Sequence, residues 1–549
     1  MNKPISKATH VANHERVATG IALACCLFSF VLGLIILRYP GVEYDEALFA
    51  DSIFPPYDLE ATISIFHHNI ATMLMPYLGT VKSFLYRAWF HVWRPSAVSI
   101  RLPALVIGIV SVWLFFLLAR RTAGRTAAVV TTVLLATDVS FLLTNCFDWG
   151  PVALQHLFLI SGVLLLVHFH QEGRGWALYA GFFLFGLGMW DKALFVWMLG
   201  GLAVAAALVF PRELFRAVTL RRVALSALCF VVGALPLVIY NLRHYGQTAR
   251  ETISISAAGF DQKTLQFWMT VNGSVMLRMA GEAGQPQEPQ TAVERLATSV
   301  QTLAGDQVNN FNDYGLVAAL ALLPLVWRTP ARRPLLFSLI FMAVVWAQMA
   351  FTANAGTSVH HVVLMWPFPL FFIAVAFSES FKRLGRLGKP LLALVVGLMA
   401  AQNLLIYNTC LNRFIRHGAV RVWTDAIYPL ADRLNQHQSD EIDVVDWGIL
   451  NSVRVLDRGR LQLVELGFIL NQPEFGDREK KYLSDLISLP HHLFVNHMRG
   501  QESFVGVGDR LTKFALERGY QRVLLETIAD RNQRPVFQIY RFQSDAKAP

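Results

Sequence analysis

The sequence predicts a polytopic α-helical membrane protein that ends in a soluble α/β domain. The chain of 549 residues is 54% hydrophobic and only 16% charged, whereas charged residues make up about a quarter of a soluble globular domain. Its mean hydropathy is +0.42. Apolar runs of roughly 17 to 25 residues, long enough to cross a bilayer as helices, recur along most of the chain.

These runs predict about 11 membrane spans within residues 1–411. Residues 1–16 are polar and weakly basic, and no small-residue cleavage site follows the first run, so we expect an uncleaved first span. The expected spans are 21–37, 100–119, 127–143, 152–167, 176–189, 193–210, 223–240, 314–327, 335–351, 362–377 and 391–406.

Basic residues follow every second span. They lie in the loops 120–125, 171–174, 211–222, 328–333 and 382–389. Because Lys and Arg accumulate in cytoplasmic loops, this pattern predicts a cytoplasmic N-terminus. It also explains the net charge of +10 without nucleic-acid binding.

The opposite, outer face then receives two long loops, 39–99 and 241–313, and the polar C-terminal part, 412–549. The first loop is rich in aromatic residues and predicts helices that lie in the membrane interface. The C-terminal part alternates strand-like and helical patterns and ends in a hairpin-like pair of strands, which predicts an extracytoplasmic α/β domain.

An acidic cluster follows the first span. The segment Gly41 to Asp51 carries Glu43, Asp45, Glu46 and Asp51 where a membrane helix would leave the bilayer. Charges at this boundary are costly unless they are paired or used. Asp45 and Glu46 could cap a helix, or act as a general base and orient an acceptor. One or two carboxylates suffice for capping, so four favour a functional site.

Three further positions on the same predicted face could join this cluster. Asp148, in T-N-C-F-D-W-G-P, is either the N-cap of the fourth span or a second acidic site group, and nearby Asp138 could take its place. Lys192, between two short apolar runs, could bind phosphate or pair with Asp191. The pair His360 and His361 could bind phosphate, but adjacent histidines alone are weak evidence for a metal.

Motifs for the common cofactors are missing. The sequence has no phosphate-binding loop, dinucleotide glycine motif or Cys/His cluster with metal spacing, so no cofactor is predicted and a divalent metal is not indicated. The cysteines lie in or beside apolar runs and are expected to be packed thiols. They are Cys25, Cys26, Cys146, Cys229 and Cys410.

The chain resembles the GT-C class of membrane glycosyltransferases, in particular the family 39-like group that includes protein O-mannosyltransferases and the lipid A aminoarabinose transferase. The resemblance lies in Y-D-E-A at 44–47, in Y-L-G-T-V-K-S-F leading to S-I-R-L-P-A-L-V-I-G at 77–108, in Asp148 and in Lys192. The chain differs from many members by Phe49 in place of Tyr and Cys146 in place of Arg.

The resemblance implies an enzyme of a bacterial inner membrane that transfers a sugar, with inversion, from a polyprenyl-phosphate donor to a lipid, glycan or protein acceptor. It implies that Asp45 is the base or acceptor-orienting group and that Glu46 and Asp148 shape the acceptor site. Lys192, with Arg243, His360 and His361, would neutralise the lipid-phosphate leaving group. The alternatives are a transporter or flippase of a lipid-linked sugar, and an inactive GT-C-like assembly subunit.

Overall fold

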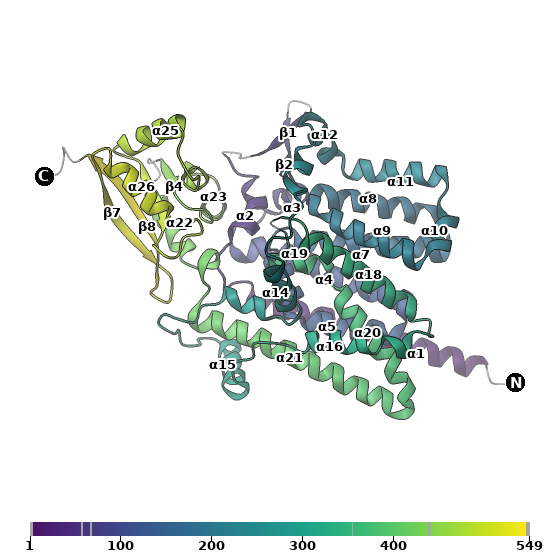
Figure 1. Ribbon diagram of the computed structural model, residues 1–549. Coiled ribbons are helices and arrows are strands. Elements are labelled where there is room, and N and C mark those ends of the chain that lie inside the picture. The colour runs from purple at the N-terminus through teal and green to yellow at the C-terminus, as the bar shows by residue number, and fades with distance from the viewer. Residues whose placement is uncertain (1–3, 56–58, 66–67, 354, 438–440, 545–549) are drawn as a thin grey trace.

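The protein consists of a helical part and a C-terminal part built on a β-sheet, which lie side by side with the N-terminus at the far end of the helical part (Figure 1). The computed structural model describes residues 4–55, 59–65, 68–353, 355–437 and 441–544. Its long apolar helices mark an integral membrane protein.

The helical part contains the apolar runs. Its principal helices are α1 (Pro4–Ile36), α4 (Ala97–Ala123), α5 (Arg125–Thr137), α6 (Val139–Phe147), α7 (Val152–Glu172), α8 (Gly175–Asp191), α9 (Val196–Val209), α10 (Pro211–Ala217), α11 (Leu220–Gly233), α12 (Leu235–Arg243), α16 (Asn312–Ala321), α17 (Leu323–Val326), α18 (Arg332–Ala350), α20 (Phe368–Phe381) and α21 (Gly388–His417).

The predicted count of about 11 spans is not confirmed. Among the described residues, five helical stretches are long and apolar enough to cross a membrane, or up to eight if each of three bent helix pairs is one span. The pair α5 and α6 bends by 60° at Asp138, and α11 and α12 bend by 77° before Pro236. Pro lacks a backbone N–H, and the Asp138 side chain accepts the Phe141 amide at 2.7 Å, so both residues start a new helix.

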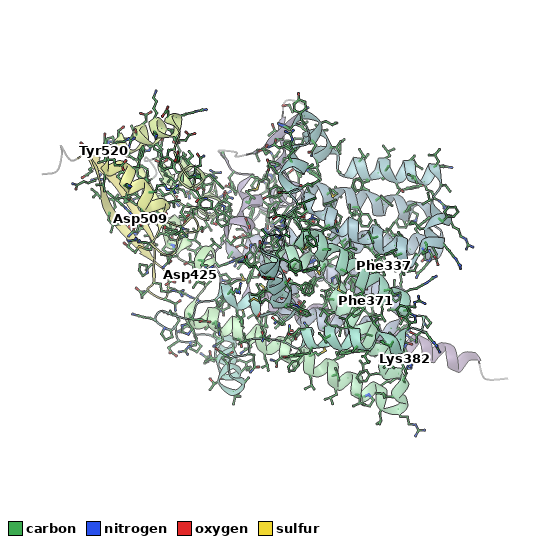
Figure 2. The ribbon with its side chains drawn as sticks, viewed as in Figure 1. Phe337, Phe371, Lys382, Asp425, Asp509 and Tyr520 are labelled. Atoms are coloured by element: carbon green, nitrogen blue, oxygen red, sulfur yellow. The ribbon has the colours of Figure 1, made fainter. Side chains whose placement is uncertain are left out.

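Helix α20 lies at the centre of the helical part. Twelve of its 14 residues are buried, as expected for a helix that is apolar all round. Phe371 on α20 and Phe337 on α18 lie inside this bundle, whereas Lys382 marks its end near the N-terminus (Figure 2).

Basic loops meet the N-terminal helix at that end. Glu15 pairs with Arg120 at 3.3 Å and Arg125 at 3.6 Å, and Arg121 pairs with Glu172 at 3.1 Å. These contacts bring α1 and the loops after α4 and α7 together. The alternating pattern of basic loops predicts this arrangement, because it places these loops on the same side as the N-terminus.

The first predicted outer loop, 39–99, combines helices with a small sheet. It forms α2 (Tyr44–Asp51), the antiparallel strands β1 (Ala61–Ile65), β2 (His68–Met75) and β3 (Leu78–Gly79), and α3 (Val81–Trp89). Interfacial helices were expected here, but not the strands. The second loop and the segment before α20 form α13 (Gln247–Thr252), α14 (Phe260–Val271), α15 (Ala292–Ala304) and α19 (Val359–Val362).

The C-terminal part is a mixed five-stranded sheet with helices, in the order β5-β4-β6-β8-β7. The predicted strands and final hairpin are present, but α21 continues past the predicted boundary at 412 to His417. The strands are β4 (Ile442–Val444), β5 (Leu463–Glu465), β6 (Leu493–His497), β7 (Tyr520–Ala529) and β8 (Pro535–Ser544). The helices are α22 (Ile427–Leu434), α23 (Leu450–Asp457), α24 (Gly467–Leu470), α25 (Asp477–Ser488) and α26 (Val507–Leu516).

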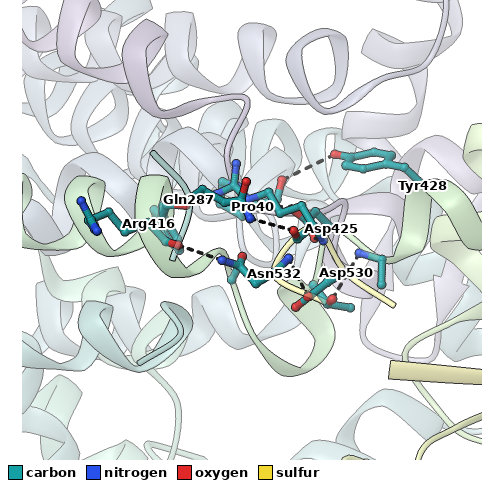
Figure 3. A network of polar contacts seen from close by, with 12 residues as sticks. Pro40, Gln287, Arg416, Asp425, Tyr428, Asp530 and Asn532 are labelled. Atoms are coloured by element: carbon teal, nitrogen blue, oxygen red, sulfur yellow. Dashed lines mark hydrogen bonds and ion pairs between the residues drawn. The ribbon is translucent and has the colours of Figure 1, made fainter. Parts of the chain in front are cut away.

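The turn between β7 and β8 joins the two parts (Figure 3). The Asn532 amide donates to the carbonyls of Gln285 at 2.7 Å and Arg416 at 2.8 Å, and Arg531 pairs with Asp425 at 3.0 Å. The hairpin is therefore hydrogen-bonded both to the second outer loop and to the end of α21.

Candidate active site

A cavity of about 330 Å³ lies where α2, β3, the end of α8 and α19 meet. Its walls include Asp45, Lys192, His360 and His361. The structure thus brings together four of the seven residues that the sequence and the family resemblance single out, although they are up to about three hundred positions apart in the chain.

Helix α2 is capped without Asp45. The Glu43 carboxylate accepts the amides of Asp45 at 2.7 Å and Glu46 at 3.2 Å, and the Glu46 carboxylate accepts the Glu43 amide at 2.8 Å. This reciprocal capping box satisfies the helix start. The Asp45 side chain is therefore left to face the cavity.

Burial raises the pKa of the Asp45 carboxyl above its ordinary value of 3.8, because a desolvated carboxylate is disfavoured. The ammonium of Lys192, a hydrogen bond with Trp149 and the ammonium of Lys82 act in the opposite direction. A carboxylate with a raised pKa beside a cation is suited to accept a proton.

Backbone contacts with β3 position Lys192. The Ala193 amide donates to the Tyr77 carbonyl at 2.9 Å, and Lys192 forms an antiparallel bridge with Leu78. Gly79 permits this approach, since a Cβ there would lie 1.9 Å from the Trp190 carbonyl oxygen.

The Lys192 side chain faces the cavity rather than an ion-pair partner within the helix. Its neighbour Asp191 accepts a hydrogen bond from Gln155 at 2.9 Å. Burial lowers the pKa of Lys192 from 10.5, and Asp45 is the strongest influence in the opposite direction. The cavity thus contains a cation opposite a carboxylate.

The two histidines form a second polar wall. Their ring centroids lie 4.4 Å apart, His360 bonds the Ser358 hydroxyl at 2.9 Å, and His361 packs edge-on against Trp197. Burial lowers both pKa values, that of His361 to about 3, with further lowering by Lys192. Both imidazoles are therefore neutral at pH 7 and can donate an N–H without carrying charge.

Asp148 lies just outside the lining of the cavity. Its Oδ1 accepts the Ala153 amide at 2.9 Å, so it caps the start of α7, and its Oδ2 pairs with the buried Lys82 ammonium at 2.5 Å. Lys82 also lies 4.5 Å above the Phe49 ring. Our sequence reasoning missed Lys82; the signal was a lysine inside the apolar, aromatic segment before the second span.

Glu46 and Arg243 do not line the cavity. Glu46 is fully buried in a bidentate pair with Arg101, which also donates to the carbonyls of Leu37 and Gly41. It therefore fastens α2 to α4 and to the end of α1. Arg243 is exposed at the end of α12.

Within the described part of the chain, no group of three or more His, Cys, Asp and Glu side chains lies close enough together to hold an ion.

The apolar helices and the C-terminal sheet together correspond to the GT-C fold. Residues 79–240 match the family model described as dolichyl-phosphate-mannose-protein mannosyltransferase. The resemblance to GT-C membrane glycosyltransferases is thereby confirmed. No curated protein matches the chain in sequence.

Solved structures share this fold at low sequence identity. ArnT from Cupriavidus metallidurans in the apo state has a TM-score of 0.57 at 14% identity, over 95% of this chain and 98% of ArnT. The same protein bound to undecaprenyl phosphate gives 0.57 at 13%, over 94% and 97%. The Archaeoglobus fulgidus oligosaccharyltransferase in complex with Zn and sulfate gives 0.52 at 12%, over 87% and 68%.

Proposed function

We propose that the protein is a membrane glycosyltransferase that moves a sugar from a polyprenyl-phosphate donor to an acceptor on the outer face of a bacterial inner membrane. One observation carries the proposal: Asp45 and Lys192 face the same cavity, beside two neutral histidines. The similarity of the fold to ArnT, whose structure contains undecaprenyl phosphate, supports a polyprenyl-phosphate donor.

The chemistry follows from these groups. Asp45 takes the proton from the acceptor hydroxyl or amine as that atom attacks the anomeric carbon. The bond between the anomeric carbon and the phosphate oxygen breaks, and the polyprenyl phosphate leaves with the electron pair. Lys192 neutralises the departing phosphate, while neutral His360 or His361 donates an N–H to it. A single displacement inverts the anomeric carbon.

The remaining predicted residues support the site from outside the cavity. Asp148, paired with Lys82, holds the start of α7 beside Lys192, and Glu46 holds α2 through Arg101. We propose that Asp148 and Glu46 are positioning residues, which hold the helices around the acceptor site in place. Arg243 is left outside this proposal because its side chain does not line the cavity.

Replacing Lys192 tests the donor site. Lys192→Met should weaken binding of undecaprenyl phosphate by about 10- to 100-fold, because hydrogen bonds to charged groups contribute roughly 1.5–3 kcal/mol. Binding is measured on purified protein in nanodiscs. The control is Lys382→Met, which removes an exposed lysine at the opposite end of the helical part (Figure 2). Unchanged affinity with only a lower melting temperature would show that Lys192 is structural.

A further inference from the structure

A second cavity, of about 360 Å³, lies at the C-terminal end of α2, beyond the part of the helix that lines the proposed active site. It is enclosed by the end of α2, the small sheet and α3. Its polar and aromatic lining consists of Ser52, Thr62, Thr80, Ser83, Phe84 and Arg87.

Arg87 is the only charged residue among the described residues that line this cavity. No described carboxylate pairs with it. The hydroxyls are held in place, since Ser52 donates to Ser83 at 2.8 Å and Thr80 donates to the Ala71 carbonyl at 2.8 Å. An unpaired guanidinium binds phosphate or carboxylate in a bidentate manner. Fixed hydroxyls and an aromatic ring suit the polar edges and apolar faces of a sugar.

Helix α2 connects this cavity to the active site. Asp45 and Ser52 are seven residues apart, which places them on one stripe of the helix and about 10 Å apart along its axis. Leu48 and Phe49 lie between them on the same stripe and line the first cavity. Ser52, in the wall of the second cavity, therefore lies about two helical turns from the proposed base.

The cavity also lies at the membrane surface. Helix α3 exposes Phe84 and Leu85, the segment after it exposes Val92 and Trp93, and the apolar helix α4 begins only a few residues later. Exposed aromatic and aliphatic side chains of this kind lie at the level of lipid headgroups. The cavity is thus open to membrane-bound ligands as well as to soluble ones.

We propose that this second cavity binds an anionic saccharide, with Arg87 on its phosphate or carboxylate group, and that this saccharide is the acceptor or the anchoring end of the acceptor. The assignment as acceptor rests on the proposed function, whereas anion binding does not. A phosphorylated sugar and an anionic lipid headgroup share the phosphate chemistry.

Binding of glucose 6-phosphate tests the site directly. The protein is placed in phosphatidylcholine nanodiscs, and glucose 6-phosphate, glucose and inorganic phosphate are titrated by calorimetry. We expect glucose 6-phosphate to bind most tightly. Arg87→Gln should raise its Kd about 10-fold, as expected for the loss of one charge-assisted contact. Ala71→Leu, which fills the cavity without changing charge, should also weaken binding.

Two controls separate this site from its alternatives. Arg94→Gln removes an exposed arginine of the same segment that does not line the cavity, and should leave the Kd unchanged. Lys382→Met, at the far end of the helical part, should also leave it unchanged. If Lys192→Met leaves binding of undecaprenyl phosphate unchanged while Arg87→Gln still weakens binding of glucose 6-phosphate, the proposed function fails but this site does not. No binding of glucose 6-phosphate, an unchanged Kd in Arg87→Gln, or a loss confined to Lys192→Met would overturn the proposal.

A further titration with an anionic lipid shows whether the cavity binds the phosphate of a sugar or that of a lipid headgroup. Adding phosphatidylglycerol to the nanodiscs should leave glucose 6-phosphate binding intact if the cavity recognises a saccharide. Displacement by phosphatidylglycerol in the wild type but not in Arg87→Gln would show that the cavity holds lipid headgroups, and would overturn the acceptor assignment.

Discussion

The Asp45 carboxylate is not needed to cap α2, because neighbouring residues already do this. Glu43 and Glu46 satisfy the start of α2 between them, and Arg101 pairs with Glu46, so the Asp45 carboxylate is left to the cavity. Four carboxylates within nine residues thus divide into a cap, a buried ion pair with α4, a contact with the C-terminal part and a group facing the cavity.

The opposite pKa shifts of Asp45 and Lys192 predict a bell-shaped dependence of turnover on pH. Burial raises the pKa of Asp45 above 3.8, so activity that needs the carboxylate is lost as the pH falls through this raised value. Burial lowers the pKa of Lys192 below 10.5, so activity that needs the ammonium is lost as the pH rises through that value. In Lys192→Arg the alkaline limb should disappear, because arginine stays charged. The measurement is kcat against pH; an unchanged alkaline limb would exclude Lys192 as its cause.

For single residues, the sequence predicted which side chains line the candidate site better than it predicted the contacts that each of them makes. Asp45, Lys192 and the two histidines line one cavity, which agrees with the prediction that they share one face of the molecule. The sequence could not show that Asp148 pairs with Lys82, since this contact depends on how α3 folds back against α7. Nor could it show that burial keeps the histidines neutral.

At the scale of elements, α2 is held between two cores. Tyr44 packs with the core of the C-terminal part, and its ring lies 4.6 Å from that of Trp447. Ala47 and Phe49 pack instead with residues of the first outer loop. Asp51 pairs with Arg454 of α23 at 3.0 Å, and both side chains are buried. The C-terminal part therefore forms the outer support of the helix that carries Asp45.

The Asp51–Arg454 pair makes this support testable. Arg454→Met leaves the buried Asp51 charge without Arg454, which should destabilise the protein by about 3–5 kcal/mol and lower turnover by loosening α2. Adding Asp51→Leu should restore much of the stability, since replacing both partners of a buried pair by apolar groups is often neutral. Thermal unfolding in detergent measures both effects.

The exposed pair of Arg433 and Glu526 provides the control for this experiment. Arg433→Met should change stability by less than about 1 kcal/mol, because surface ion pairs contribute little. Equal losses in Arg433→Met and Arg454→Met would argue against a specific support of α2 by Asp51 and Arg454.

Element prediction from the sequence succeeded where periodicity was strong. The final hairpin and the strand that became β6 were expected, and the structure contains both. The count of about 11 spans is not confirmed. Hydropathy also does not reveal the bends at Asp138 and before Pro236, which interrupt the expected spans 127–143 and 223–240 and depend on backbone capping and a missing N–H. The strands of the first outer loop were missed because they lie in a segment that reads as aromatic and amphipathic.

For the whole molecule, the two ends of the helical part carry different chemistry. The N-terminal helix contacts basic loops at one end, and α2, α19 and the C-terminal sheet lie toward the other (Figure 1). The positive-inside rule then predicts the orientation in the membrane. Reporter fusions after Arg125 and Arg333 should be cytoplasmic, and a fusion after Ser544 should be external. An external reporter at Arg125 would reverse the orientation and place the cavity in the cytoplasm.

The most direct test of the central claim is transfer of sugar from a lipid-linked donor by Asp45→Asn. A general base contributes about 10²- to 10⁴-fold, so turnover should fall by that factor while the protein remains folded, because the α2 cap is formed by Glu43 and Glu46. The assay follows release of polyprenyl phosphate in proteoliposomes with matched amounts of protein, and the matched control is Asp313→Asn, a half-buried aspartate outside the cavity. Turnover in Asp45→Asn equal to that of the wild type would contradict the account and favour the transport of a lipid-linked sugar over its transfer.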